Sequence, residues 1–377
     1  MKRKNNLYSD LYDIDNIIKM TDRVLSKVKN KERREKFLLY YSEHIINIKN
    51  RLESKNINLG KYNIFLITDP KCRVIMSQSI EDKIINHLIA EYLLVRVFEN
   101  RYIDSMCATR INKGSGYATK LMKKYLNEIK LKYNKFYILK LDIKKYFYNI
   151  DHDILKRMLK DNIKDKKAIN LLFKVIDSTN DTYINEQIIK LKNNRINNLS
   201  NEKLILETKE IPLYKYNKGC GIGDQTSQAF GLIYLNEICH FIKEELHIKY
   251  FINYMDDFVI IHHDKEYLNY CLNTIKDKLY KDYKLELNRK TRIYNISEGV
   301  EFLGYRFIIK NNKVIMKLRS ITKKNFKRQV RMLKLLKDYN YISSKKYRLL
   351  LSGYKGCLDK GNCSNLYYRS VVYDWFI

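Results

Sequence analysis

The feature that most constrains this chain is a pair of adjacent carboxylates, Asp256 and Asp257, inside an apolar segment. The runs 250–253 and 258–261 on either side predict a buried β-hairpin with both carboxylates at its centre. Burying charge is costly unless a partner compensates it, and no Lys or Arg lies within four residues of the pair. A divalent cation is the simplest partner, because Mg2+ prefers carboxylate oxygens. The alternative is a plain tight turn, where Asp is common.

A further carboxylate that could join the Asp pair lies upstream in the chain. Asp142 closes the apolar segment 136–142, which predicts a strand with this carboxylate at the rim of a sheet, within reach of ligands. With the Asp pair it suits a site for two metal ions ~3.5–4 Å apart, as used for in-line phosphoryl transfer. Asp142 alone would equally suit a helix N-cap, so the prediction depends on the combination.

Composition limits the partners. The 73 Lys and Arg residues against 42 Asp and Glu give a formal net charge of +31, which predicts a polyanionic partner, foremost nucleic acid. The seven cysteines are scattered and form no Cys-x-x-Cys pair, which predicts reduced thiols in a cytoplasmic protein and argues against a zinc ribbon. No apolar run reaches the ~18 residues that would span a membrane, so no membrane partner is expected.

The periodicity predicts three regions. Residues 1–60 are expected to form an N-terminal helical extension, and residues 61–312 a core with a polar, Asn-rich, exposed insertion at about 178–210. Residues 313–377 contain helices dense in Lys and Arg. Around the carboxylates the expected order is strand, helix, strand, strand, which predicts an α+β fold with a palm-like antiparallel sheet.

Five motifs occur in an order that resembles a reverse transcriptase. They are Asp142-x-x-x-Tyr146-Phe147, Gly223–Gln228, Tyr254–Asp257, Leu287–Thr291 and Phe302–Tyr305. The resemblance extends upstream to Asp69–Arg73 and Ala108–Gly114 and covers about residues 61–310. It implies a right-hand polymerase fold, with fingers and an antiparallel palm over 61–312 and a helical thumb over 313–377.

The resemblance also implies catalytic roles. Asp142, Asp256 and Asp257 match the metal-binding triad, which would hold two Mg2+ ions, with Mn2+ as a substitute. The backbone carbonyl of Ile143 matches a further metal ligand. Phe147 matches the aromatic steric gate that excludes a 2′-hydroxyl. Without the flanking motif, this residue would be interpreted as an aromatic side chain of the core.

Four more residues match substrate contacts of the family. Arg73 and Arg110 match the fingers residues that clamp the triphosphate, to which the guanidinium fork is suited. Gln228 matches the segment that lines the nucleotide and template pocket. Lys290 matches the position that protonates the leaving pyrophosphate, with a plain phosphate contact as the alternative.

The Ser227-Gln228 ending resembles bacterial enzymes of diversity-generating retroelements and of the unknown-group, defence-associated branch. The implied function is an RNA-directed DNA polymerase that makes cDNA by two-metal nucleotidyl transfer from a dedicated, structured non-coding RNA in antiphage defence. Its partners would be the RNA template, a DNA primer or cDNA product, and dNTPs. The alternatives are mutagenic retrohoming, template-independent or protein-primed synthesis, and a non-catalytic RNA-binding scaffold. An accessory protein or a homo-oligomer, the priming mode and the template sequence stay open.

Overall fold

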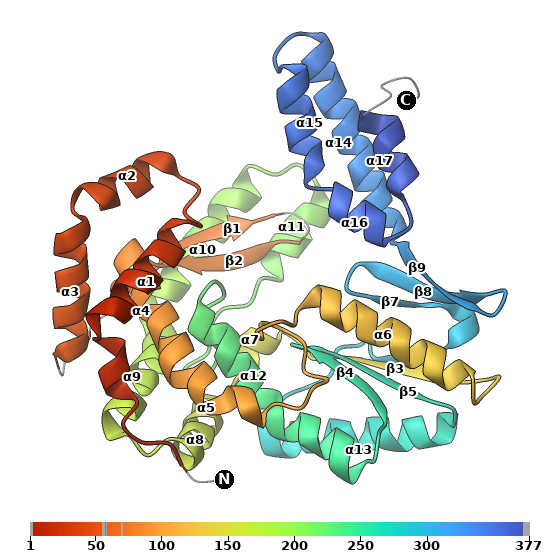
Figure 1. Cartoon of the computed structure of the whole chain (residues 1–377), viewed down its shortest axis with the longest axis horizontal. Coiled ribbons are helices and arrows are strands. Elements are labelled where there is room, and N and C mark those ends of the chain that lie inside the picture. The colour runs from red at the N-terminus through yellow and green to blue at the C-terminus, as the bar shows by residue number, and fades with distance from the viewer. Residues whose placement is uncertain (1–2, 55–56, 58, 69–70, 372–377) are drawn as a thin grey trace. The chain divides into compact units, whose positions relative to one another are not determined.

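The computed structural model describes residues 3–54, 57, 59–68 and 71–371, and its elements are drawn in Figure 1. Asp69 and Pro70 of the first upstream motif lie outside the described residues. The chain divides into two units. Unit 1 comprises residues 1–110, 142–245 and 274–288, and unit 2 comprises residues 111–141, 246–273 and 289–377.

The N-terminal helices of unit 1 form as the apolar spacing predicts. After a 3-10 turn, η1 (Tyr8–Leu11), come α1 (Ile14–Leu25), α2 (Lys31–Leu39) and α3 (Tyr41–Glu53). The Asp13 side chain caps α1 by accepting the amide of Asn16. The buried face of α1 packs against α3 and α4 (Ile80–Leu88). A π-helical turn, η2 (Ile89–Val95), and the short elements α5 (Arg96–Phe98) and η3 (Glu99–Arg101) continue α4.

A two-stranded antiparallel hairpin, β1 (Asn63–Ile67) and β2 (Arg73–Ser77), follows in unit 1. The stretch predicted as an exposed insertion instead forms α10 (Thr182–Asn197) and α11 (Glu202–Lys209), and α10 packs against β1. The reason is that Ile184 and Ile188 lie one turn apart and are fully buried against the hairpin. The polar residues between them obscure this apolar face.

The centre of unit 1 is α12 (Gln225–His240), which is buried on most of its surface and continues as a π-helical turn, η5 (Phe241–Glu245). Helix α8 packs against it. The remaining helical elements of the unit are α7 (Tyr146–Asn149), α8 (His152–Asn162), α9 (Lys166–Asp177) and η4 (Ser178–Asn180). Helix α13 (Lys265–Tyr283) contributes residues to both units.

Unit 2 contains a four-stranded sheet in the order β4-β5-β3-β6. Its strands are β4 (Tyr250–Tyr254), β5 (Asp257–His262), β3 (Tyr137–Asp142) and β6 (Arg292–Asn295). The β4–β5 and β3–β6 pairs are antiparallel. Helix α6 (Ser115–Lys130) packs across β4 and β5 (Figure 1), and the rings of Phe251 and Phe258 stack within the hairpin.

The C-terminal part of unit 2 begins with strands. After η6 (Ile296–Glu298), a three-stranded antiparallel sheet contains β7 (Val300–Phe302), β8 (Tyr305–Lys310) and β9 (Lys313–Leu318). The predicted thumb is therefore helical only from Ser320, because the alternating residues of 313–318 pair with β8. Its helices are α14 (Ser320–Asp338), α15 (Ser344–Ser352), α16 (Lys355–Lys360) and α17 (Ser364–Val371). Residues 372–377 lie outside the described residues.

The α+β class with an antiparallel sheet is thus confirmed, while the three domain boundaries stay predictions. Across the described ranges, every helix is too short or too polar to cross a bilayer.

Candidate active site

The predicted hairpin around the Asp pair is present in unit 2. Tyr254 pairs with Asp257, so the loop between β4 and β5 contains only Met255 and Asp256. Met255 has a φ of 55°, which places a bulky residue in the left-handed region that favours glycine. Such strain costs on the order of 1–3 kcal/mol and persists only where surrounding contacts impose it. The strained turn is what presents two adjacent carboxylates at one edge of the sheet.

Asn253 holds this turn, a role that the motif comparison missed. Its side chain is fully buried in β4, and its Nδ2 donates a hydrogen bond of 2.6 Å to the carbonyl oxygen of Met255. Within the described part of the chain, its Oδ1 has no hydrogen-bond partner. The only signal in the sequence is an amide residue inside an otherwise apolar strand, next to the turn.

Strand β3 brings Asp142 to the same sheet as the Asp pair. Asp142 is the last residue of β3, and β3 neighbours β5, which begins with Asp257. Lys140 Nζ lies 3.5 Å from Asp257 Oδ1. Since residues two apart on a strand share a face, Asp142 lies on the face from which Lys140 reaches Asp257. A cation therefore does compensate the Asp pair in part, but it comes from a neighbouring strand.

The donor set fits a hard divalent ion. Three carboxylates and a backbone carbonyl are the oxygen ligands that Mg2+ and Mn2+ take. Ile143 forms a bridge with Leu287, flanked by hydrogen bonds from Asn288 N–H to the Asp142 carbonyl and from Lys144 N–H to the Glu286 carbonyl. In this pattern the Ile143 carbonyl points away from residues 286–288. No three metal-binding side chains among the described residues are gathered closely enough to hold an ion as they stand, so metal binding stays a prediction.

Phe147 lies in unit 1, in the one-turn helix α7. Its half-buried ring packs on Gly231 of α12, where an added Cβ would come within 3.3 Å of the ring. Its carbonyl accepts the amide of Cys220 at 2.8 Å. The Tyr146 hydroxyl donates to the Gly231 carbonyl at 2.6 Å. The ring is thus packed against α12 and stays half-buried, and its role as a steric gate stays a prediction.

Strand β2 and the Gly-rich turn before α12 are joined in unit 1. The Met76 amide donates to the Ile222 carbonyl at 2.8 Å. Gly223 has a φ of 136°, and a Cβ there would sit 2.4 Å from the Met76 carbonyl oxygen, so only glycine fits. This contact holds β2 against the Gly-rich turn. The exposed Arg73 belongs to β2, and the half-buried Gln228 follows the turn in α12.

Asp224, at the N-cap of α12, is a buried acid that the motif comparison did not single out. It accepts a 2.8 Å hydrogen bond from the Tyr62 hydroxyl. Burial raises the pKa of Asp224 to about 7, and the hydrogen bond from Tyr62 opposes part of that rise. The carboxyl therefore titrates near neutral pH beside the Gly-rich turn.

Arg110 is placed differently from the expectation. Its guanidinium is 6% exposed, donates to Glu99 Oε1 at 2.9 Å and to the carbonyls of Ile103 and Met106, and lies over the Tyr102 ring. These contacts use the donors that a triphosphate would need. In this structure Arg110 fixes the loop that follows η3, so its role at the triphosphate stays a prediction.

Lys290 lies in an exposed turn just before β6, in the same unit as the Asp pair. Its role stays a prediction.

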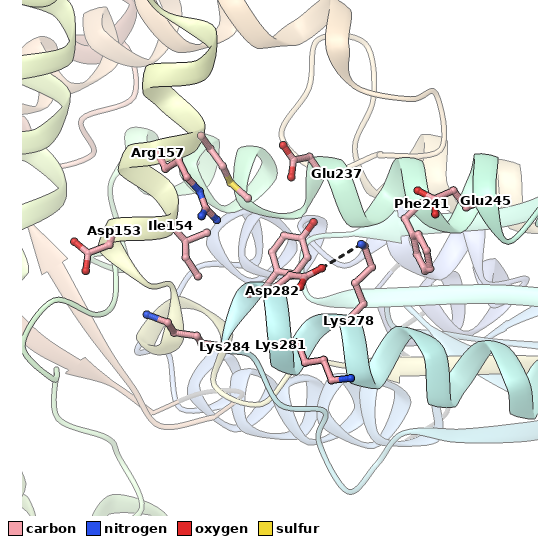
Figure 2. Close-up of a pocket in the computed structure, with 12 residues that line it drawn as sticks. Asp153, Ile154, Arg157, Glu237, Phe241, Glu245, Lys278, Lys281, Asp282 and Lys284 are labelled. Carbon is pink, nitrogen blue, oxygen red and sulfur yellow. Dashed lines mark hydrogen bonds and ion pairs between the residues drawn. The ribbon is translucent and has the colours of Figure 1, made fainter.

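A cavity of about 830 Å3 lies elsewhere in unit 1 and is shown in Figure 2. Side chains of α8, α12, η5 and α13 line it, and Lys278 and Asp282 face each other across 3.1 Å. None of the predicted site residues lines it, so it is not the carboxylate site.

Comparisons with known proteins agree with the motif series. A family model described as Reverse transcriptase (RNA-dependent DNA polymerase) matches residues 67–307. A search of curated proteins gave no significant match.

Structures of telomerase show a remote similarity. Apo telomerase from Candida tropicalis, truncated from the C-terminal domain, is 16% identical with a TM-score of 0.44 over 69% of this chain and 55% of that chain. Telomerase from Candida albicans, in complex with a TWJ fragment of telomeric RNA, is 16% identical with a TM-score of 0.44. The match covers 85% of this chain and 62% of that chain. The present chain thus spans between 55% and 62% of the length of these telomerase chains.

Proposed function

The chain belongs to the reverse transcriptase family, and we propose that it is an RNA-directed DNA polymerase that makes cDNA by two-metal nucleotidyl transfer. The observation that carries the mechanism is one edge of the four-stranded sheet. There the strained Met255 turn presents Asp256 and Asp257, and the neighbouring strand ends at Asp142. Backbone strain of this kind clusters at functional sites, which supports a ligand at the carboxylate pair.

The residues around this edge have separate tasks in the proposal. When bound, Mg2+ or Mn2+ would lower the pKa of the primer 3′-hydroxyl and stabilise the charge on the leaving pyrophosphate. Asp142, Asp256, Asp257 and the Ile143 carbonyl hold the ions. Lys140, which now lies near Asp257, balances charge at the edge.

Substrate selection uses the residues of unit 1 and one of unit 2. Arg73, exposed on β2, holds the triphosphate through its bidentate fork. The Phe147 ring, supported by Gly231, excludes a 2′-hydroxyl. Gln228 lines the nucleotide and template pocket, and Lys290 donates to the pyrophosphate. The exposed basic residues of α14 follow the backbone of the nucleic acid without reading its sequence: Lys324, Lys327, Arg328 and Arg331.

We further propose that the template is a dedicated non-coding RNA and that the setting is antiphage defence in a bacterium. The support is the Ser227-Gln228 ending of the Gly-rich motif. Mutagenic retrohoming is the second candidate, since the same ending occurs in that branch.

Sequencing the nucleic acid that co-purifies with the full chain tests the template proposal. One enriched RNA species, with cDNA complementary to it, is the expected result. A copy carrying scattered substitutions of one template base would favour retrohoming. DNA of no templated sequence, or nucleotides attached to a tyrosine in mass spectrometry, would favour template-independent or protein-primed synthesis instead.

A further inference from the structure

Five aromatic rings of unit 2 form a continuous series, which we call the aromatic ladder: Tyr133, His263, His262, Tyr267 and Tyr270. The Tyr133 and His263 rings are stacked, with centroids 4.0 Å apart and planes at 2°. The following centroid distances are 4.4 Å, 4.9 Å and 6.0 Å, with the ring planes inclined at 37°, 48° and 29°. The rings come from the loop between α6 and β3, from the end of β5 and from α13.

The ladder lies far from the carboxylates along the sheet. Strand β5 begins with Asp257 and ends with His262. At ~3.3 Å per residue, its two ends are about 17 Å apart. The ladder therefore belongs neither to the Asp pair nor to the nucleotide contacts described above.

The middle of the ladder is held in place. The Asp264 amide donates to His262 Nδ1 at 3.1 Å, and the Tyr267 hydroxyl donates to the Leu246 carbonyl at 2.8 Å. The Asp264 carboxylate caps α13 by accepting the amides of Glu266 and Tyr267. A ligand that stacks on preformed rings loses little affinity to side-chain ordering.

The ends of the ladder are open to solvent. Tyr133 is 38% exposed and Tyr270 is 57% exposed, and all residues of 131–135 are exposed. The His263 ring covers one face of Tyr133, so the exposed 38% of this residue lies on the rest of its surface.

The charges beside the ladder favour a polyanion. Lys132, Lys135 and Lys265 are exposed next to ladder residues, against Asp264, which is used as a helix cap, and the exposed Glu266. The whole chain carries a formal charge of +31. Proteins bind unpaired nucleic acid without reading its sequence by stacking its bases on aromatic side chains that lie beside positive charges.

We propose that the aromatic ladder binds a single-stranded segment of RNA, whose bases continue the stack from Tyr133. The choice of RNA over DNA rests on the proposed function, in which RNA is the template. The ladder would hold a stretch of RNA that is not being copied, at the end of β5 opposite to the carboxylates.

Binding of fluorescent oligo(U) to the full chain, followed by anisotropy, tests this proposal. Tyr133→Ala is expected to weaken binding about 5-fold to 150-fold, since one base–aromatic stack contributes ~1–3 kcal/mol. Tyr133→Phe keeps the ring and should bind as the wild type does. The matched control is Tyr216→Ala, which removes an 82% exposed tyrosine of unit 1 and should change nothing.

Several results would overturn the proposal. They are equal binding by Tyr133→Ala and wild type, an equal loss in Tyr133→Phe, or an equal loss in Tyr216→Ala. Tighter ladder-dependent binding of oligo(dT) or of duplex RNA would also overturn it. Should Tyr133→Ala fail to fold, photocrosslinking of 4-thiouridine RNA to the wild type decides, because crosslinks must then map to residues 131–135 or 262–270.

The failure of this proposal and of the proposed function can be told apart. The binding assay needs no catalysis and can be repeated on Asp256→Asn. Ladder-dependent binding in a chain without polymerase activity would contradict only the function. Polymerase activity with binding that ignores Tyr133 would contradict only the ladder.

Discussion

Replacing Asn253 by Leu should impair catalysis without lowering the stability of the protein by more than about 1 kcal/mol. Leucine of similar volume removes the 2.6 Å hydrogen bond to the Met255 carbonyl, which costs ~1–3 kcal/mol because that carbonyl loses its buried donor. The substitution also removes Oδ1, a buried oxygen without a partner in the described part of the chain, which returns a similar amount. The two effects should offset each other to within about 1 kcal/mol.

The turn, however, would lose what holds Met255 at a φ of 55°. If the strain of ~1–3 kcal/mol then relaxes and moves the two carboxylates, kcat should fall by a similar free energy, or about 5-fold to 150-fold. Urea unfolding gives the stability, and single-nucleotide primer extension gives kcat.

Asn236→Leu is the matched control, because Asn236 Oδ1 is also buried without a partner among the described residues but lies in α12. Full activity in Asn253→Leu would refute the idea that this side chain positions the Asp pair. A large loss of stability with proportionate loss of activity would show a merely structural role.

Other residues give separate expectations. Because burial raises the pKa of Asp224 to about 7, the native state keeps a proton that the unfolded chain has already lost. The free energy of unfolding should therefore fall by up to about 1.4 kcal/mol per pH unit as pH rises from about 4 to about 7. Asp224→Asn should remove this dependence in urea unfolding series, whereas an unchanged slope would place the titration elsewhere. Arg73→Ala should raise the KM for dNTPs at least about tenfold through the loss of a bidentate phosphate contact. Arg110→Lys should lower the melting temperature and leave that KM unchanged; the reverse pattern would restore Arg110 as the clamp. Phe147→Ala should admit ribonucleotides in primer extension, and an unaltered sugar preference would remove its role as gate.

The hairpin and its carboxylates were predictable because their signal is local. Two charges between apolar runs leave few arrangements other than a turn at the end of two buried strands. The apolar segment 136–142 predicts a strand that ends at Asp142, but the metal-binding role of Asp142 is predictable only in combination with the Asp pair.

Other parts of the site depend on which strands become neighbours. Lys140 reaches Asp257 only because β3 lies beside β5, and the sequence does not state this order. The hydrogen bond from Asn253 to Met255 depends on a two-residue turn with a positive φ, which is unusual for methionine.

At two places, Arg110 and the segment 178–210, the sequence alone does not decide which contacts form. The planar guanidinium of Arg110 could bind a triphosphate, but it can equally donate to Glu99 and to nearby backbone carbonyls. Which of these it contacts depends on the conformation of the loop after η3. Ile184 and Ile188 are separated by polar residues, so their shared face became clear only with the β1–β2 hairpin against it.

The most direct test of the account is primer extension by the full chain on an RNA template, with and without Mg2+. We expect templated DNA product only with a divalent ion present. Asp256→Asn and Asp257→Asn should each lower the rate at least about 100-fold, as removal of one charge-stabilising group does in other enzymes. Tyr216→Ala, which changes an exposed tyrosine outside the predicted site, should keep the wild-type rate and controls for differences between protein preparations. Equal product from wild type and from either Asp variant, or product that persists in excess EDTA, would contradict the two-metal polymerase site.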